Sequence, residues 1–434
     1  MKSCTRNCTT LMALFAVLTI SAPLAAQTRY RIVNLDNLGG TAGGANSIND
    51  RGWVTGTTNL QGNQFSRATL WLKNASPINL GTLGGPNSNS AVAWPVKNNN
   101  GVIVGISEIE EINPLGERFS CPGFFGTPLT GRSCRGFRWQ NGVMTALPTL
   151  GGYNSYATGA NNRGQAVGWA ENTVQDPTCM HPRQVLQFRA VIWGSKKGEI
   201  QELPPFGEDS TSAATAINDE GQAVGISGKC DRAVGRFSAR HAVLWENGVP
   251  RNIGDFGGIA WNTPTAINHQ GTIVGFSDFP GDDSGVPNFH AFISFGGGPI
   301  QDLKTVDDDP YSLPFGINDK NQVVGQSLDA DFNSRAFIWE NGKMTDLNSL
   351  VPAGSPFLIY ANDINELGEI AGQACNPDQC AAGVTFAFLA IPDHDAESSS
   401  TAHSEKDQDK KVQLPKSLRE QLRAQWGVEF ADDK

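Results

Sequence analysis

Residues 217–225 read Ile-Asn-Asp-Glu-Gly-Gln-Ala-Val-Gly, and this pattern indicates the architecture because it returns six more times along the 434-residue chain. The other copies span residues 48–56, 97–105, 160–168, 267–275, 317–325 and 364–372. The Asn-x-x-Gly portion is typical of a tight turn, and the apolar run after it is typical of a short strand. Short strands and turns repeated at intervals of about fifty residues predict a β-propeller, a β-array or a solenoid.

Four short strands, which we name A to D, are predicted around the fourth copy. They cover residues 213–217, 222–226, 241–245 and 249–253. Gly221 can adopt positive φ in the A–B turn, and Glu246-Asn247-Gly248 is a hairpin signal between strands C and D. Four antiparallel strands per repeat are typical of a propeller blade.

Strand C ends in tryptophan in five of the seven copies, which favours packing between neighbouring blades over ligand binding. These residues are Trp71, Trp139, Trp193, Trp245 and Trp339. Strand D occurs seven times only if Tyr30–Leu35 is counted, because the last copy ends after its C strand near Pro392. We therefore predict an all-β, seven-bladed β-propeller over residues 27–392, in which the N-terminal strand completes the last blade and removes the open edges.

The chain resembles the HAF-repeat family of exported bacterial proteins, which is named for a His-Ala-Phe motif. The motif stands at residues 290–292, with the variants His-Ala-Val at 241–243 and Arg-Ala-Phe at 335–337. Leu-Gly-Gly at 38–40, 83–85 and 150–152 fits the same pattern. The resemblance covers roughly residues 28–392 and implies an exported repeat protein, without implying an activity.

The ends of the chain are predicted to lie outside the propeller. Residues 1–26 have a basic start, an apolar run and small residues before Gln27, as a signal peptide does. We expect removal of this segment to release an extracellular or periplasmic protein without membrane insertion. Residues 393–411 are polar and predict a disordered linker, and residues 412–434 predict a short amphipathic helix that docks on the propeller or binds a partner.

The formal net charge of -10 argues against non-specific nucleic-acid binding, which needs a basic face. A monomer is expected. Six cysteines follow the signal segment, and an even number in an exported chain favours disulfides over free thiols or a zinc site. Proximity of the loops suggests the pairs Cys121–Cys134, Cys179–Cys230 and Cys375–Cys380, out of the fifteen pairings that six cysteines allow.

The B–C and D–A loops of a propeller share one face, which we call the loop face. They are long and irregular here, as binding loops on a rigid scaffold often are. Aromatic residues in or beside these loops are candidates for stacking on sugar rings, although packing against their own loops is the alternative. The ligand-binding candidates are Trp94, Tyr153, Tyr156, Trp261 and Tyr311.

Acidic residues also gather in these loops, at residues 108–111, 208–209, 282–283 and 307–309. These carboxylates could ligate calcium or act as a pair in glycoside chemistry. However, no spacing matches an EF-hand loop, and the sequence singles out no catalytic pair. The sequence therefore predicts a non-catalytic module, without a required cofactor, that binds a polysaccharide or a protein through the loop face. A polysaccharide-active hydrolase or lyase and a structural envelope or matrix protein are the alternatives.

Overall fold

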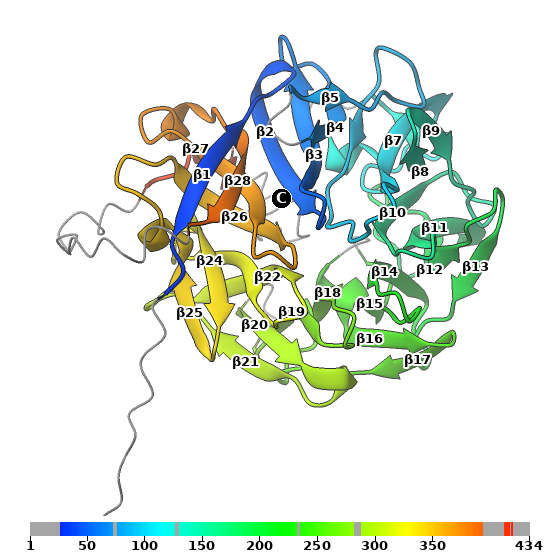
Figure 1. The fold of residues 1–434 in the computed structure, drawn as a ribbon. Coiled ribbons are helices and arrows are strands. Elements are labelled where there is room, and N and C mark those ends of the chain that lie inside the picture. The colour runs from blue at the N-terminus through cyan, green and yellow to red at the C-terminus, as the bar shows by residue number, and fades with distance from the viewer. Residues whose placement is uncertain are drawn as a thin grey trace, which may run out of the picture.

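A ring of seven sheets surrounds a central axis in the computed structural model (Figure 1). The structure describes residues 27–72, 76–125, 130–231, 235–281, 288–393, 412–416 and 418–419. Within these ranges each sheet has four strands, paired antiparallel, so the predicted seven-bladed β-propeller is confirmed. The expected signal peptide lies outside the described residues, as do all but the first residue of the expected linker and most of the expected C-terminal helix.

Blades 1 to 3 take up the first half of the chain. Blade 1 contains β2 (Gly39–Ile48), β3 (Trp53–Leu60), β4 (Ser66–Leu72) and β5 (Ile78–Asn79). Blade 2 contains β6 (Ser90–Ala91), β7 (Ile103–Ile112), β8 (Arg132–Gln140) and β9 (Val143–Ala146). Blade 3 contains β10 (Ser155–Ala160), β11 (Ala166–Gln175), β12 (Leu186–Trp193) and β13 (Ile200–Leu203).

Blades 4 to 6 repeat this order of four successive strands. Blade 4 contains β14 (Thr211–Ile217), β15 (Ala223–Gly228), β16 (His241–Glu246) and β17 (Val249–Asn252). Blade 5 contains β18 (Thr263–Ile267), β19 (Ile273–Asp278), β20 (Phe289–Ser294) and β21 (Gln301–Lys304). Blade 6 contains β22 (Tyr311–Ile317), β23 (Val323–Leu328), β24 (Ser334–Glu340) and β25 (Lys343–Asp346).

Blade 7 closes the ring with strands from both ends of the propeller. It contains β26 (Phe357–Ile364), β27 (Ile370–Cys375), β28 (Phe386–Pro392) and, at its outer edge, β1 (Tyr30–Leu35). Strand β1 pairs antiparallel with β28, from Tyr30 opposite Pro392 to Leu35 opposite Ala387. The predicted closure by the N-terminal strand is therefore confirmed.

Short 3₁₀ helices lie in the connections. They are η1 (Pro122–Phe124), η2 (Arg236–Ala239), η4 (Phe295–Gly297), η5 (Leu347–Leu350) and η6 (Cys380–Ala382).

The last glycine of each repeat is explained by close contact between strands A and B. A Cβ atom built on Gly225 would lie 2.1 Å from the carbonyl oxygen of Ala213, a distance that no side chain can occupy. The same clash, at 1.9–2.3 Å, would arise at Gly56, Gly105, Gly168, Gly275, Gly325 and Gly372. The register of the A–B pair shifts beside this point, between Ala214 and Ala216 in blade 4. The glycine is thus required by backbone packing.

The strand-C tryptophans join neighbouring blades, as expected. Trp193 of blade 3 and Trp245 of blade 4 are fully buried. The indole of Trp193 donates to the carbonyl of Pro148 (2.9 Å), and that of Trp245 donates to Pro204 (2.7 Å). Each acceptor follows strand D of the preceding blade, so a tryptophan both fills the space between two sheets and satisfies its polar atom there.

Candidate functional site

The A–B turns form an inner ring of asparagines on the face opposite the loop face. Asn268 illustrates the pattern: its Oδ1 accepts the backbone N–H groups of Gln270 (3.1 Å) and Thr272 (2.8 Å), and its Nδ2 donates to the carbonyl of Asn318 in the next blade (3.1 Å). Equivalent inter-blade bonds of 3.0–3.2 Å join Asn49 to Asn98, Asn161 to Asn218, Asn218 to Asn268, Asn318 to Asn365 and Asn365 to Asn49. The repeated asparagine thus stabilises its own turn and ties it to the next blade.

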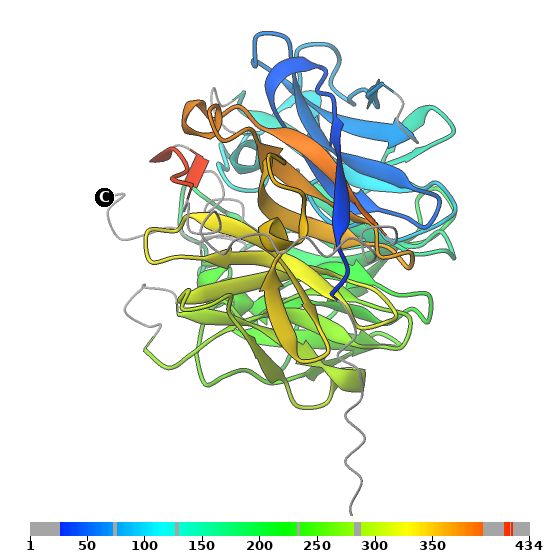
Figure 2. The same cartoon turned by 60° about the vertical axis from the view of Figure 1, so that its left-hand side comes forward.

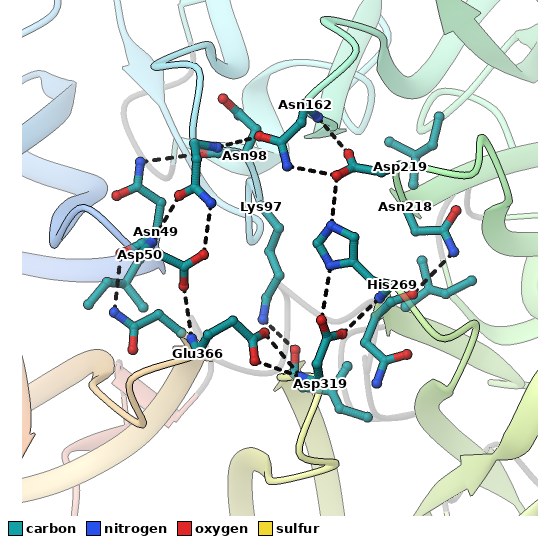
Figure 3. Close-up of a pocket in the computed structure, with 17 residues that line it drawn as sticks. Asn49, Asp50, Lys97, Asn98, Asn162, Asn218, Asp219, His269, Asp319 and Glu366 are labelled. Atoms are coloured by element: carbon teal, nitrogen blue, oxygen red, sulfur yellow. Dashed lines mark hydrogen bonds and ion pairs between the residues drawn. The ribbon is translucent and has the colours of Figure 1, made fainter.

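A second ring, formed by the residue after each asparagine, surrounds the axis (Figure 3). We call it the turn ring; it contains Asp50, Asn99, Asn162, Asp219, His269, Asp319 and Glu366. In six of the seven steps the backbone N–H of one member donates to a side-chain oxygen of the next, over 2.6–3.0 Å. The turn ring lines a pocket of about 490 Å³, including its open mouth.

His269 occupies the remaining step of the turn ring. Its Nε2 lies 2.7 Å from Asp219 Oδ2, and its Nδ1 lies 3.4 Å from Asp319 Oδ2. Burial works against the charged imidazole, but the hydrogen bond with Asp219 and the surrounding carboxylates raise the pKa of His269 overall. Burial also works against ionised Asp219, yet hydrogen bonds from Asn162 and His269 lower the pKa of its carboxyl overall. The turn ring therefore favours a protonated histidine between two carboxylates.

The Lys97 side chain extends through the middle of the turn ring in the view of Figure 3 and lines the same pocket. It stands in the second repeat where five other copies have isoleucine. Its ammonium donates to the carbonyl oxygens of Ile317 and Ile364 (2.7 Å for the latter) and lies 3.2 Å from Asp363 Oδ1. Asp363 is fully buried, and burial raises the pKa of its carboxyl despite the opposing effect of Lys97. The pocket is thus lined by polar groups that already bind one another.

Trp94 crosses the axis nearer the loop face. Its indole Nε1 donates to the carbonyl of Thr265 in blade 5, 3.2 Å away. Strand A of blade 2 is reduced to Ser90–Ala91, so the following residues are free to leave the sheet and reach the axis. Trp94, a predicted ligand-binding residue, therefore lies inside the ring of blades.

An apolar cluster fills the loop-face side of the axis and extends toward blades 5 to 7. Its buried members are Ala260, Trp261, Phe276, Phe289, Leu313, Phe315, Leu328, Ile359, Tyr360, Cys375, Cys380, Leu414 and Leu418. Trp94, Phe237, Tyr311, Phe357 and Val412 pack against it. Three of these residues, Val412, Leu414 and Leu418, come from the C-terminal segment rather than from the propeller.

The C-terminal segment lies on the loop face beside blades 6 and 7 (Figure 2). We call the described residues 412–416, 418 and 419 the tail segment. The backbone N–H of Leu414 donates to Asn333 Oδ1 (3.0 Å), and Arg419 Nη1 donates to the carbonyl of Asp331 (2.5 Å). Both acceptors belong to the B–C connection of blade 6. For the part of the predicted C-terminal helix that the structure describes, docking on the propeller is therefore the observed arrangement.

The five predicted ligand-binding aromatics do not form an exposed set, which corrects the expectation for two of them. Tyr156 and Trp261 are buried, with 2% and 1% of their surfaces exposed. Tyr156 lies within β10 and packs edge-to-face on Phe124, with ring centres 4.9 Å apart. Trp261 has positive φ (51°) and belongs to the apolar cluster. Neither presents an accessible ring for stacking on a sugar.

The other three candidates differ in exposure. Tyr311 is half-buried and stacks on Phe332, with ring centres 4.9 Å apart. Trp94 is half-buried at the axis. Tyr153 is 40% exposed in the D–A loop that leads into blade 3.

The loop face contains all three predicted disulfides, and the proposed pairing is confirmed. Cys121–Cys134 closes the B–C loop of blade 2, Cys179–Cys230 joins the B–C loops of blades 3 and 4, and Cys375–Cys380 lies in blade 7. Cys134 and Cys375 are in strands β8 and β27, at the borders of their loops.

Two buried carboxyls that the sequence did not single out hold the loops of blades 2 and 3 together. Glu117 accepts the backbone N–H groups of Val185 (3.0 Å) and Leu186 (2.9 Å), which belong to the neighbouring blade. Asn154 Nδ2 donates both to Glu117 (3.2 Å) and to Glu171 (3.0 Å). Burial and the nearby charge of Glu117 raise the pKa of Glu171 to about 7, against the effect of its hydrogen bonds.

Four of the acidic residues considered for calcium or catalysis make internal contacts in the described part of the chain. Asp309 and Asp307 pair with Arg335, at 2.8 Å and 3.1 Å. Asp209 lies 2.8 Å from His241 Nδ1, and Glu108 accepts from the backbone and side chain of Asn89 (2.6 and 3.0 Å). Residues 282–283 lie outside the described ranges. Among the described residues, no three His, Cys, Asp or Glu side chains are grouped to hold a metal ion.

No protein-family model and no curated protein sequence matches the chain. Acylaminoacyl peptidase from Pyrococcus horikoshii is a structural neighbour with 12% identity and a TM-score of 0.44, over 79% of this chain and 51% of that one. This chain thus spans about half the length of the peptidase. The β-propeller domain of the trilobed protease from Pyrococcus furiosus is 10% identical with a TM-score of 0.44, over 80% of this chain and 95% of the domain.

A chain of the mitotic checkpoint complex is also 10% identical, with a TM-score of 0.47, over 89% of this chain and all of that one. These distant likenesses carry no inference about function. Within the described part of the chain, no helix is both long and apolar enough to cross a membrane.

Proposed function

We propose that this chain is an exported, non-catalytic recognition module that binds a protein ligand through the loop face. The observation that carries the proposal is the tail segment, a stretch of polypeptide already seated there by buried side chains and main-chain hydrogen bonds. A surface that accepts one peptide segment has the shape and polarity to accept another. Three disulfides support an oxidising location, and the HAF-like repeats support assignment to that exported family.

A protein ligand is favoured over a polysaccharide by the exposure of the aromatic candidates. Stacking on sugar rings requires accessible aromatic faces, whereas Tyr156 and Trp261 are buried and Tyr311 already stacks on Phe332. The pocket inside the turn ring is not the proposed binding site. The side chains that line it bind neighbouring blades, so we assign the turn ring an architectural role.

The test is to screen the chain from residue 27 against a displayed library of random 15-residue peptides and, in parallel, a glycan array. Hydrogen–deuterium exchange then maps each hit. We expect saturable peptide hits that protect B–C or D–A loops. Hits only on the glycan array, hits that protect only the A–B turns, or the release of products from the arrayed polysaccharides would overturn the proposal.

A further inference from the structure

We propose that the site covered by the tail segment, which we call the groove, binds a partner segment bearing two leucines four residues apart. The groove is lined by the B–C loop of blade 6 and by the apolar cluster, and the tail segment is its resident intramolecular occupant. This inference rests on the proposed function and specifies its ligand. It starts from Leu414 and Leu418, whose exposed surfaces are 2% and 7%. The backbone N–H groups of Leu418 and Arg419 both donate to Pro415 O (3.0 Å), so one helical turn places the leucines on the same side.

The receiving loop, residues 329–333, also has hydrogen bonds of its own. Asp329 N–H donates to Asn333 O (3.1 Å), and Asp329 Oδ1 accepts the N–H groups of Asp331 and Asn333 (both 2.9 Å). The side chain of Asn333 is held in turn by Asp329 Oδ2 (3.1 Å), which leaves Asn333 Oδ1 directed at Leu414 N–H. A preformed acceptor of this kind costs a ligand little ordering energy.

Phe332 in the same loop supports the idea of a prepared surface. Its φ of 62° is unusual for a residue with a bulky side chain and places its ring on Tyr311, with an interplanar angle of 17°. Tyr311 packs against the apolar cluster that receives Leu414 and Leu418. The groove therefore combines an apolar floor with acceptors at its edge, namely Asn333 Oδ1 and the carbonyl of Asp331. This combination suits an amphipathic helical segment.

The tail segment is suited to exchange rather than to permanent docking. The gain from burying two leucine side chains is smaller than the backbone entropy lost by ordering the seven residues of the tail segment, so the net association is weak. Its occupancy depends on covalent attachment through residues 394–411, which raises its effective concentration at the groove. A partner that presents the same two leucines with further contacts would displace it.

The experiment measures binding of a fluorescent peptide with the sequence of residues 412–426 by anisotropy. Wild-type protein, with the groove occupied, is compared with the variant L414D/L418D, in which charged side chains cannot remain in the apolar cluster. We expect the variant to bind the peptide at least tenfold more tightly. The matched control Q413D places the same charge on an exposed residue of the tail segment and should bind like wild type.

Two further variants keep the outcome clear. Should L414D/L418D fail to fold, as judged by circular dichroism, L418S carries the same test. Adding N333A to the opened variant removes the acceptor for Leu414 N–H and should weaken the peptide at least threefold. Equal peptide affinity for wild type and opened variant, or no binding by either, would overturn the inference. So would a concentration-dependent dimer of the wild type, because it would place the tail of a second copy in the groove.

Failure of this inference is distinguishable from failure of the proposed function. If the 412–426 peptide does not bind but library peptides still protect other parts of the loop face, the recognition function stands and the groove assignment is wrong. If neither protects the loop face, both are wrong.

Discussion

Replacing Lys97 with isoleucine tests how the axis of the propeller is held together. The substitution restores the residue that five other repeats carry at this position, so it introduces no unusual side chain. It removes the ammonium group 3.2 Å from Asp363 Oδ1 and leaves that carboxyl fully buried. The three donors that remain are Ser47 Oγ (3.2 Å) and the backbone N–H groups of Ile48 (3.0 Å) and Ile364 (2.9 Å).

The size of the loss has a lower and an upper limit. Removing one partner of a buried ion pair typically costs about 3–5 kcal/mol, and the lower limit is therefore about 3 kcal/mol. The carboxyl can escape its charge by taking a proton, which at pH 7 costs about 4 kcal/mol from its ordinary pKa of 3.8. We therefore expect Lys97→Ile to lower the free energy of unfolding by about 3–4 kcal/mol at pH 7.

The loss should depend on pH in a defined direction. Burial raises the pKa of Asp363, so above pH 3.8 the folded variant binds more protons than the unfolded chain and its stability falls as pH rises. At pH 5 the cost of protonation is about 2 kcal/mol, so the penalty of the variant should shrink by about half.

The assay is urea unfolding at pH 7 and pH 5, followed by tryptophan fluorescence and circular dichroism, with coincident transitions as the check of two-state unfolding. Asp363→Ala should cost about 2 kcal/mol, because Lys97 keeps two carbonyl partners. The double variant should cost little more than Asp363→Ala alone, giving a coupling energy of about 3 kcal/mol. A Lys97→Ile loss below about 1 kcal/mol at pH 7, or additive single losses, would refute this account.

Three further predictions concern ring closure, the turn ring and the disulfides. Tyr30→Ala should lower the free energy of unfolding by about 3–5 kcal/mol because its buried ring anchors β1, whereas the exposed Arg31→Ala on the same strand should change it little. His269 has a raised pKa, so it contributes stability below its ordinary value of 6.5 that is lost as pH rises through the folded pKa. Because its side chain is half exposed, that contribution is at most about 1 kcal/mol, and the melting temperatures of wild type and His269→Asn should converge as the pH rises above 6.5. Replacing Cys179 and Cys230 with serine opens a loop of 51 residues and should cost about 4 kcal/mol in urea unfolding, against about 2 kcal/mol for the five-residue disulfide of blade 7.

Most of the fold could be predicted from the sequence because each repeat encodes local geometry. Asn218 and Gly221 define a turn, and Gly225 meets a backbone position that excludes a side chain. Counting strand types then led to the pairing of β1 with β28. Disulfide pairing also followed, because the propeller order brings the loops of blades 3 and 4 together.

The candidate site was less predictable because exposure depends on contacts between distant segments. Tyr156 was assigned to a loop, but β10 begins at Ser155 and turns the ring toward Phe124. Trp94 and Lys97 visibly depart from the repeat, yet nothing local indicates that both reach across the axis. The position of Leu414 depends on a hydrogen bond from its backbone N–H to Asn333, which lies 81 residues earlier in the sequence.

Closure by β1 and β28 also imposes an order of events during synthesis. Asn37, just after β1, donates to the carbonyl of Thr385, just before β28, and these residues are 348 positions apart. The earliest strand to emerge therefore has no partner until nearly the whole propeller has been made. Until then β1 is unpaired and the last sheet has an open edge, and both are sites for mispairing with other chains. Productive folding in crowded conditions should accordingly depend on how long the nascent chain is shielded before its two ends meet.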